Sequence, residues 1–171
     1  MIHTERLTLV PLQIEHAETL LDLWSDPQVI RFTNMKCIET LNECRKKVSS
    51  RIKTPVQFYA VLKDGTVAGM AACPIIKDED TFECGFAYQI IRKYWGNGIG
   101  YEAAKGLFDY IANEHKNAVV YADVVADNTA SVRILDKLGF ERYGNETEGF
   151  CRDGIKYDVI NYKRIFKNEV Y

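Results

Sequence analysis

The feature that most constrains this chain is a run of three alternating glycines, Gly96, Gly98 and Gly100, within residues 92–103. A strand-like apolar pattern precedes the run, and a helix-like pattern follows it directly. Alternate glycines leave out Cβ atoms, so the backbone can turn tightly and approach a ligand closely. The helix that follows exposes unpaired N–H groups and a partial positive charge at its first turn. The segment therefore predicts a seat for a phosphate or pyrophosphate group.

Two common nucleotide-binding loops fit this run poorly. The phosphate loop of nucleotide triphosphatases ends in Gly-Lys-Ser/Thr, whereas residues 100–102 read Gly-Tyr-Glu. The dinucleotide fingerprint has the spacing G-x-G-x-x-G and begins a doubly wound unit. Here the glycines read G-x-G-x-G and lie past mid-chain. The glycines alone leave one further alternative open, a tight strand-to-helix turn that binds nothing.

Length and composition predict one domain over residues 1–171, since 47% of the residues are hydrophobic and 27% are charged. The net charge of −2 gives no sign of nucleic-acid binding. No apolar run approaches the length of a membrane span, and the first residues lack the pattern of a signal peptide. The five cysteines include no C-x-x-C pair and the three histidines are scattered, so we expect neither disulfides nor a metal site. These features predict a cytoplasmic protein with reduced thiols.

Hydrophobic periodicity predicts an alternation of helices and strands. Helices are expected over residues 13–24, 41–52 and from 99 onward, with a shorter one after Asn128. Strands are expected over residues 7–10, 56–62, 66–76, 81–91, 118–125, 140–147 and 156–166. Strand 81–91 runs directly into the glycine loop. Its side chains alternate between an apolar face and a face that is small except for Glu83 and Gln89.

Five short stretches of the sequence are each weak evidence for a family, but their order along the chain is specific when they are taken together. They read TERL at 4–7, WSDP at 24–27, ECGF at 83–86, WGNGIGYEA at 95–103, and NTAS at 128–131 through KLGF at 137–140. With these stretches the chain resembles the GNAT superfamily of acyl-CoA-dependent N-acetyltransferases. Within that superfamily it is most similar to the branch that acetylates N-terminal alanines of ribosomal proteins.

The resemblance implies an α+β fold, with a mixed, mostly antiparallel sheet of six or seven strands and helices on both faces. In that fold the strand holding Glu83 and the strand ending near Val125 splay apart, and acetyl-CoA lies in the gap. Backbone donors freed by the splay can pair with the pantetheine amides. The cofactor-binding residues that the resemblance implies are Tyr88, Gln89, Ile90, Trp95, Gly96, Asn97, Gly98, Ile99, Gly100, Tyr101 and Asn128.

The chain departs from the family pattern at Trp95, where Arg or Gln is usual. The departure removes one cation near the cofactor. Arg92 or Lys93 could replace it, or the backbone amides could suffice.

Acetyl transfer to an amine needs a neutral amine, a polarised thioester and a proton for the leaving thiolate. An α-amine, with a pKa near 8, is partly neutral at pH 7, whereas lysine is almost fully charged. A carboxylate acting through water can then serve as the base. Glu83 is the candidate base, and its alternative role is that of a solvated or ion-paired strand residue.

Ser131 is the candidate proton or hydrogen-bond donor to the departing thiolate. Asn128 is first the N-cap of its helix, and it could also hold a pantetheine group or an active-site water. The alternative donors to the thiolate are Tyr143, Tyr157 and Tyr162.

The sequence thus predicts an acetyl-CoA-dependent N-acetyltransferase that acts by direct transfer, without a metal. Its expected partners are acetyl-CoA and a primary amine, either a protein N-terminus or a small molecule, with neither nucleic acid nor membrane involved. A homodimer is left open, and the acceptor is not encoded in the pattern. A non-catalytic acyl-CoA-binding module is the alternative, but it would not need both Glu83 and Ser131. A nucleotide-binding oxidoreductase is disfavoured by the glycine spacing and the antiparallel strand order.

Overall fold

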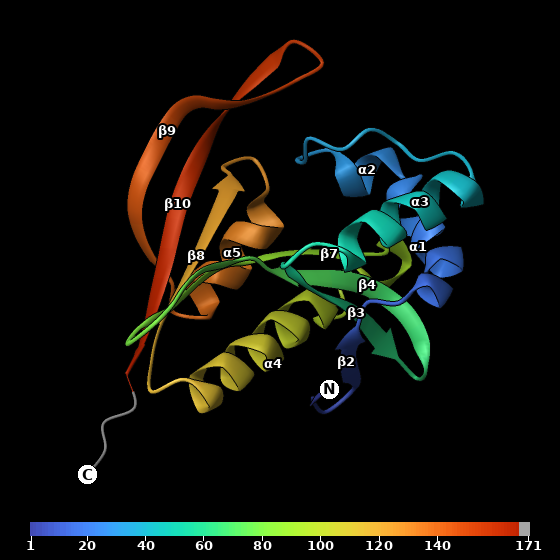
Figure 1. Ribbon diagram of the computed structural model, residues 1–171. Helices are drawn as coiled ribbons and strands as arrows, with labels where there is room; N and C mark the ends of the chain where they lie inside the picture. The colour runs from blue at the N-terminus through green and yellow to red at the C-terminus, as the bar shows by residue number, and fades with distance from the viewer. Residues whose placement is uncertain (168–171) are drawn as a thin grey trace.

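The chain forms two five-stranded sheets with helices on both faces (Figure 1). The structure is a computed structural model that describes residues 1–167. The first sheet has the order β1-β2-β3-β4-β7 and is antiparallel throughout. The second has the order β5-β6-β8-β10-β9 and contains one parallel pair, β6 with β8. The predicted mixed, mostly antiparallel architecture is confirmed, with its strands divided between two sheets.

The bounds of the longer helices follow the periodicity, whereas several strands differ from it. The strands are β1 (Ile2–His3), β2 (Leu7–Pro11), β3 (Gln57–Lys63), β4 (Thr66–Cys73), β5 (Ile75–Asp78), β6 (Phe82–Gly85), β7 (Ala87–Ile90), β8 (Asn117–Val125), β9 (Glu141–Arg152) and β10 (Ile155–Lys167). The helices are η1 (Ile14–His16), α1 (Ala17–Trp24), α2 (Pro27–Ile30), α3 (Leu41–Ile52), η2 (Arg92–Tyr94), α4 (Ile99–Glu114) and α5 (Thr129–Lys137). No helix among residues 1–167 is long and apolar enough to span a membrane.

Side-chain caps begin α3 and α5 where the sequence predicts them. Thr40 accepts from the backbone of Glu43, and the Glu43 carboxylate accepts from the backbone of Thr40, which is a capping box. Asn128 Oδ1 accepts from Ser131 N at 3.3 Å and so begins α5. Gly139, with φ +74°, follows the end of that helix, because this left-handed conformation suits glycine.

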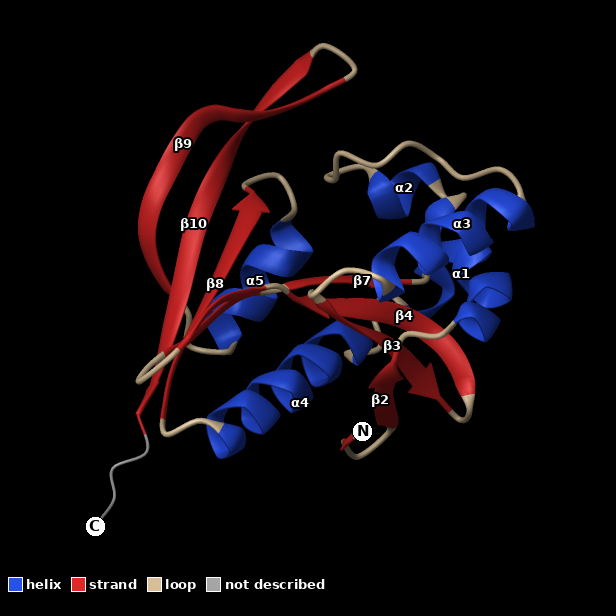
Figure 2. Ribbon diagram, viewed as in Figure 1, coloured by secondary structure: helices blue, strands red, loops and turns tan. Residues whose placement is uncertain are grey.

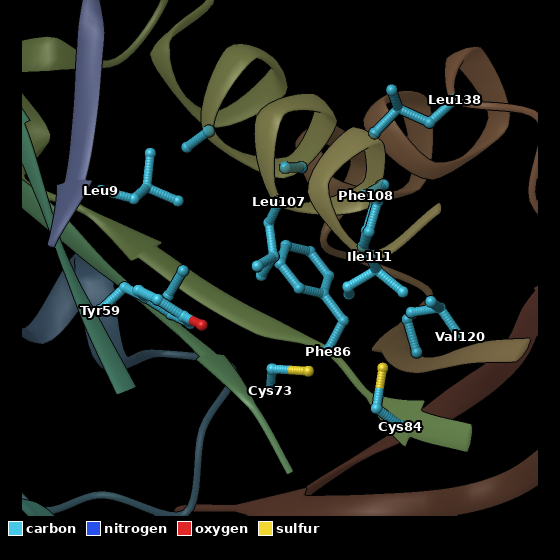
Figure 3. Close-up of a cluster of buried hydrophobic side chains, with 14 of the residues drawn as sticks. Leu9, Tyr59, Cys73, Cys84, Phe86, Leu107, Phe108, Ile111, Val120 and Leu138 are labelled. Atoms are coloured by element: carbon cyan, nitrogen blue, oxygen red, sulfur yellow. The ribbon is translucent and has the colours of Figure 1, made fainter. Parts of the chain in front are cut away.

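Two apolar cores lie on opposite faces of the sheets. Helices α1, α2 and α3 gather on one side of β4, and α4 crosses the other side (Figure 2). The core beneath α4 contains Leu107, Phe108 and Phe86, with the thiols of Cys73 and Cys84 among them (Figure 3). All five cysteines are free thiols. The two cores fix the sheets relative to the helices, which places the segments that line the site.

The predicted strand 81–91 is wrong as a single strand, because it divides at Phe86. Residues before Phe86 pair with β5 and β8, whereas residues after it pair with β4 in the other sheet. The last link to β8 is the bond from Phe86 N to Tyr121 O, at 2.8 Å. The predicted strand 66–76 likewise breaks at Pro74, which has no N–H to donate to a ladder. Beyond Tyr121, β8 keeps β10 as its partner and diverges from β7.

The closing strands form one long hairpin in place of two short strands joined by a loop. A two-residue turn, Asp153-Gly154, joins β9 to β10, and both turn residues have positive φ, 52° and 78°. This conformation matches the right-handed twist of the flanking strands, so the hairpin can be long. Residues 148–155, which lie between the two predicted strands, are therefore mostly strand.

Candidate active site

A cleft of about 840 Å³ opens where β7 and β8 diverge. One wall is β7 with the glycine loop and the start of α4, and the other is the end of β8 with α5. Residues 28–33, which comprise the end of α2 and the segment after it, line a further part of the cleft. A cleft of this size accommodates a small-molecule ligand or cofactor.

The glycine loop supplies a row of free backbone donors. Gly96 and Gly98 have φ of +76° and +74°, and Gly98 is the N-cap of α4. Within residues 1–167, the amides from Gly96 to Tyr101 donate to no protein acceptor. These amides stand at the N-terminus of a 16-residue helix, where the partial charge is positive. The arrangement suits a pyrophosphate group.

The loop is held from behind by the N-terminal TERL stretch. Arg6 Nη1 donates to Asn97 O at 3.0 Å, and Arg6 Nε donates to Glu102 Oε2 at 2.6 Å. Thr4 Oγ1 donates to the other oxygen of Glu102, also at 2.6 Å. Burial acts to raise the pKa of Glu102, but the hydrogen bonds from Thr4 and Arg6, with the Arg6 charge, lower it overall. Two of the stretches that carried the resemblance are therefore joined in space.

Arg6, which the sequence reading did not propose, is a cation in direct contact with the loop. Arg92 forms an ion pair with Asp26 at 2.7 Å, and Lys93 lies over the ring of Tyr94. Neither side chain lines the cleft. The indole of Trp95 donates to Ile90 O at 2.7 Å, so it braces the turn between β7 and the loop.

Ten of the eleven predicted cofactor-binding residues line the cleft. They are Tyr88, Gln89, Ile90, Trp95, Gly96, Gly98, Ile99, Gly100, Tyr101 and Asn128. Asn97 does not line it, because its side chain donates to Trp95 O at 3.1 Å and its carbonyl accepts from Arg6. Asn97 therefore shapes the loop from the rear.

Ser131 lies in the cleft wall beside a tyrosine. Its Oγ is 3.0 Å from the Tyr88 hydroxyl, and both residues line the cleft. Burial raises the pKa of Tyr88, and the hydrogen bond with Ser131 opposes this only in part. Tyr88 therefore remains protonated near neutral pH. The pair gives the cleft a hydroxyl donor with a second hydroxyl behind it.

The alternative tyrosine donors lie elsewhere. Tyr162 is fully buried and donates to Asp136 Oδ1 at 2.9 Å. Tyr143 is half exposed and packs edge-on against Tyr121. Tyr157 packs edge-on against Phe32. None of the three lines the cleft.

Glu83 lies on β6, before the strands diverge, and does not line the cleft. It accepts a hydrogen bond from the Tyr121 hydroxyl at 3.0 Å. Burial, followed by this hydrogen bond and the carboxylate's charge, raises the pKa of Tyr121. Glu83 and Ser131 are thus not brought into direct contact by the described structure.

Asp123 is a carboxylate that the sequence reading missed and that does line the cleft. It is exposed and accepts from Nδ2 of the buried Asn161 at 2.9 Å. The available signal was an acidic residue within the apolar run of β8. Within the described range, no group of three or more His, Cys, Asp or Glu side chains is arranged to hold a metal ion.

Comparison with known structures identifies the fold as that of acetyltransferases. A ribosomal L7/L12 alpha-N-protein acetyltransferase, RimL, solved with coenzyme A, matches with a TM-score of 0.80 and 19% identity, over 95% of this chain and 96% of that one. A spermidine N-acetyltransferase from Vibrio cholerae, solved with CoA and spermine, matches with a TM-score of 0.79 and 18% identity, over 95% and 96% of the two chains.

Sequence comparison agrees with this class. The uncharacterized N-acetyltransferase p20 of Bacillus licheniformis is 26% identical over 157 residues, which cover 89% of this chain and 85% of the relative. The family model of the acetyltransferase (GNAT) domain matches residues 6–141. The chain therefore belongs to the GNAT acetyltransferase family. The prediction of an acyltransferase is confirmed at this level.

Proposed function

We propose that the protein transfers the acetyl group of acetyl-CoA directly to a primary amine. The observation that carries this proposal is the cleft between β7 and β8, with free amides in one part of its wall and the Tyr88–Ser131 pair in another. The pyrophosphate would accept from the amides of Gly96 to Tyr101. The pantetheine arm would follow β7 into the cleft, where the divergence from β8 frees main-chain groups.

Five wall residues of the cleft leave the acceptor an approach to the thioester that differs from the route of the cofactor. Gln28, Val29, Arg31, Phe32 and Thr33, in α2 and the segment after it, line the cleft and lie far from the glycine loop in sequence. We assign this part of the wall, residues 28–33, to the amine acceptor and call it the acceptor wall. The assignment gives the two substrates separate entries, as direct transfer requires.

The transfer itself needs two proton movements. The amine nitrogen forms a bond to the acetyl carbonyl carbon, the carbon–sulfur bond breaks, and the sulfur leaves with the electron pair. Ser131 donates a proton or a hydrogen bond to that sulfur; where a proton is transferred, Tyr88 returns one to Ser131 through their 3.0 Å contact and regains its own from water. The amine loses its proton to a carboxylate through water.

Two carboxylates are candidates for that base. Glu83 is the prediction from the sequence, and its route to the cleft would use the Tyr121 hydroxyl or a water. Asp123 lines the cleft itself and is oriented by Asn161. Asp123 lies in the cleft wall and Glu83 does not, which supports Asp123 as the base. The pH–rate profiles of variants at the two positions distinguish the candidates.

The structural relatives support two classes of acceptor to test. The names of the two structural relatives include an α-N-protein acetyltransferase and a spermidine N-acetyltransferase, so both kinds of amine are acted on by proteins of this fold. An α-amine is partly neutral at pH 7 and needs only modest help from a base. We propose a peptide N-terminus as the first acceptor to test and a polyamine as the second.

Calorimetric titration tests the first half of the proposal. Acetyl-CoA and NAD both carry an adenosine pyrophosphate, so NAD is the matched control ligand. We expect saturable binding of acetyl-CoA and at least about tenfold weaker binding of NAD, a difference of about 1.4 kcal/mol. Equal affinity for the two, or binding of NAD alone, would overturn the assignment.

A further inference from the structure

One arginine of the β9–β10 hairpin makes direct hydrogen bonds to the backbone of the acceptor wall and of the residues after it, although it lies far away in the sequence. Arg152, the last residue of β9, directs Nη1 at the carbonyl oxygens of Ile30, Thr33 and Met35, at 3.2, 2.6 and 2.8 Å. These carbonyls are 117 to 122 residues away in the chain. Arg152 does not line the cleft, whereas Thr33 does.

A second contact joins the same two segments. Phe32, in the acceptor wall, packs edge-on against Tyr157 of β10 with ring centroids 5.7 Å apart. Tyr157 in turn lies against Phe150 of β9, at 6.1 Å. The hairpin and the segment after α2 face one another above β7 and the end of β8 (Figure 2). Both strands of the hairpin therefore contact the wall.

The acceptor wall has little regular secondary structure of its own, although Ile30 is buried and Thr33 donates to Ile30 O from its N and Oγ1. Helix α2 is a single turn of four residues, and residues 35–39 after it form no helix or strand. The carbonyls at the end of a helix have no partner within it. Here a guanidinium donates to the Ile30 carbonyl at the end of α2 and to the Thr33 and Met35 carbonyls in the segment after it. Hydrogen bonds from a charged donor are stronger than neutral ones.

The ionic surroundings of Arg152 leave its guanidinium available for this role. Its one ion-pair partner in the described chain is Asp153, at 3.7 Å, whose side chain is 89% exposed. The Arg152 side chain itself is only 23% exposed. An exposed pair at that distance contributes little, so the three carbonyls are its main contacts.

We propose that Arg152 is a positioning residue for the amine acceptor. By holding Ile30, Thr33 and Met35, it fixes where Phe32 and its neighbours stand in the cleft, and so sets the space for the part of the acceptor next to the reacting amine. The inference rests on the proposed function and deepens it. It assigns acceptor recognition to a contact between the C-terminal hairpin and the segment after α2, and cofactor binding to other residues.

The test compares Arg152→Met, which keeps most of the side-chain volume and loses the donors, with Arg152→Lys, which retains a cation and three N–H groups. Arg142→Met is the matched control. Arg142 lies on the same strand, but its guanidinium contacts Asp136 of α5, away from the acceptor wall. Hydrogen exchange of residues 30–36, acceptor KM, kcat and acetyl-CoA affinity are measured for each protein.

We expect Arg152→Met to raise hydrogen exchange over residues 30–36 and acceptor KM by at least about tenfold each. Exchange of residues 96–101, kcat and acetyl-CoA affinity should stay within about twofold of wild type. Arg152→Lys should recover part of the loss, and Arg142→Met should resemble wild type.

Unchanged exchange over residues 30–36 in Arg152→Met would overturn the proposal. So would an equal loss of acetyl-CoA affinity, because the arginine would then support the fold generally. Raised exchange with unchanged acceptor KM would also refute it, since the wall would not recognise the acceptor. If wild type acetylates no amine, the proposed function fails, but the exchange measurement still shows separately whether Arg152 orders the wall.

Discussion

The hydroxyl of Tyr88 on β7 lies 3.0 Å from Ser131 Oγ at the start of α5, so one hydrogen bond joins the two sides of the cleft. Ser131→Ala should lower kcat by about a hundredfold, the lower end of the usual contribution of a general acid. Acetyl-CoA affinity should change little, because the interaction grows only in the transition state. Rapid-quench or steady-state kinetics with calorimetry separate the two effects.

Tyr88→Phe distinguishes the two hydroxyls. If Tyr88 only supports Ser131, its loss should cost less turnover than Ser131→Ala. Near-normal turnover in Ser131→Ala, with a large loss in Tyr88→Phe, would assign the donor role to the tyrosine instead. Tyr162→Phe is a control, because that hydroxyl contacts Asp136 outside the cleft.

The base is tested by pH–rate profiles of Glu83→Gln and Asp123→Asn. Loss of the true base should lower the reaction rate most at low pH, where the amine is charged. The rate should partly recover relative to wild type as the pH rises. For an α-amine the rescue should approach completion above about pH 8, whereas for a polyamine it should continue towards about pH 10. A constant ratio of variant to wild-type rate from pH 6 to 9 excludes that residue as the base. Excluding both would leave Asp127, which also lines the cleft, or water itself as the proton acceptor.

The glycine loop is tested by Gly98→Val. The Cβ of a branched side chain at this position would lie 3.4 Å from Arg6 Nη2, and the side chain also disfavours the φ of +74°, so the loop proposed to bind the pyrophosphate would shift. We expect acetyl-CoA affinity to fall at least about tenfold, or 1.4 kcal/mol. Gly65→Val is the control, because Gly65 has φ +75° with no atom near its missing Cβ and lies in the β3–β4 turn. Equal loss of affinity in both variants would attribute the effect to backbone strain.

Glu102 links the stability of the glycine loop to pH. Its pKa is lowered in the folded protein, so its contribution is present above the ordinary glutamate pKa of about 4.3 and is lost as the pH falls through the lower folded value. Glu102→Gln should cost about 1 to 2 kcal/mol at pH 7, because it weakens charge-assisted bonds from Arg6 and Thr4.

That cost should shrink below about pH 4, where wild type also loses the charge. Chemical denaturation at several pH values measures it. Lys105→Met, which removes an exposed pair with Asp109 on the same helix, should show little effect at any pH. A cost for Glu102→Gln that is independent of pH would contradict the ionic account.

The parts of this fold that local sequence specifies were predictable. The caps at Thr40 and Asn128, the glycine N-terminus of α4 and the apolar run of β8 all depend on neighbours within a few residues. Their side chains and backbone conformations determine the local structure directly. The same applies to the glycine loop. Ten of the eleven predicted cofactor-binding residues, from β7, the glycine loop with the start of α4, and the N-cap of α5, line the cleft.

The parts that depend on distant partners were not predictable from pattern. Nothing near Phe86 in the sequence shows that β6 and β7 join different sheets, because this depends on Pro74 and on β8. Asp123 lines the cleft only because β8 continues past Tyr121, where its pairing with β6 ends. The contacts of Arg152 span more than a hundred residues, so no periodicity in the sequence indicates them.

The most direct measurement is mass spectrometry of products after incubating the protein with acetyl-labelled acetyl-CoA and a panel of peptides and polyamines. The account predicts that the label appears on a primary amine of at least one acceptor, with release of an equal amount of free CoA, and that Gly98→Val reduces this transfer. Binding of acetyl-CoA without labelling of any amine above the enzyme-free rate would contradict it and favour a non-catalytic acyl-CoA-binding protein.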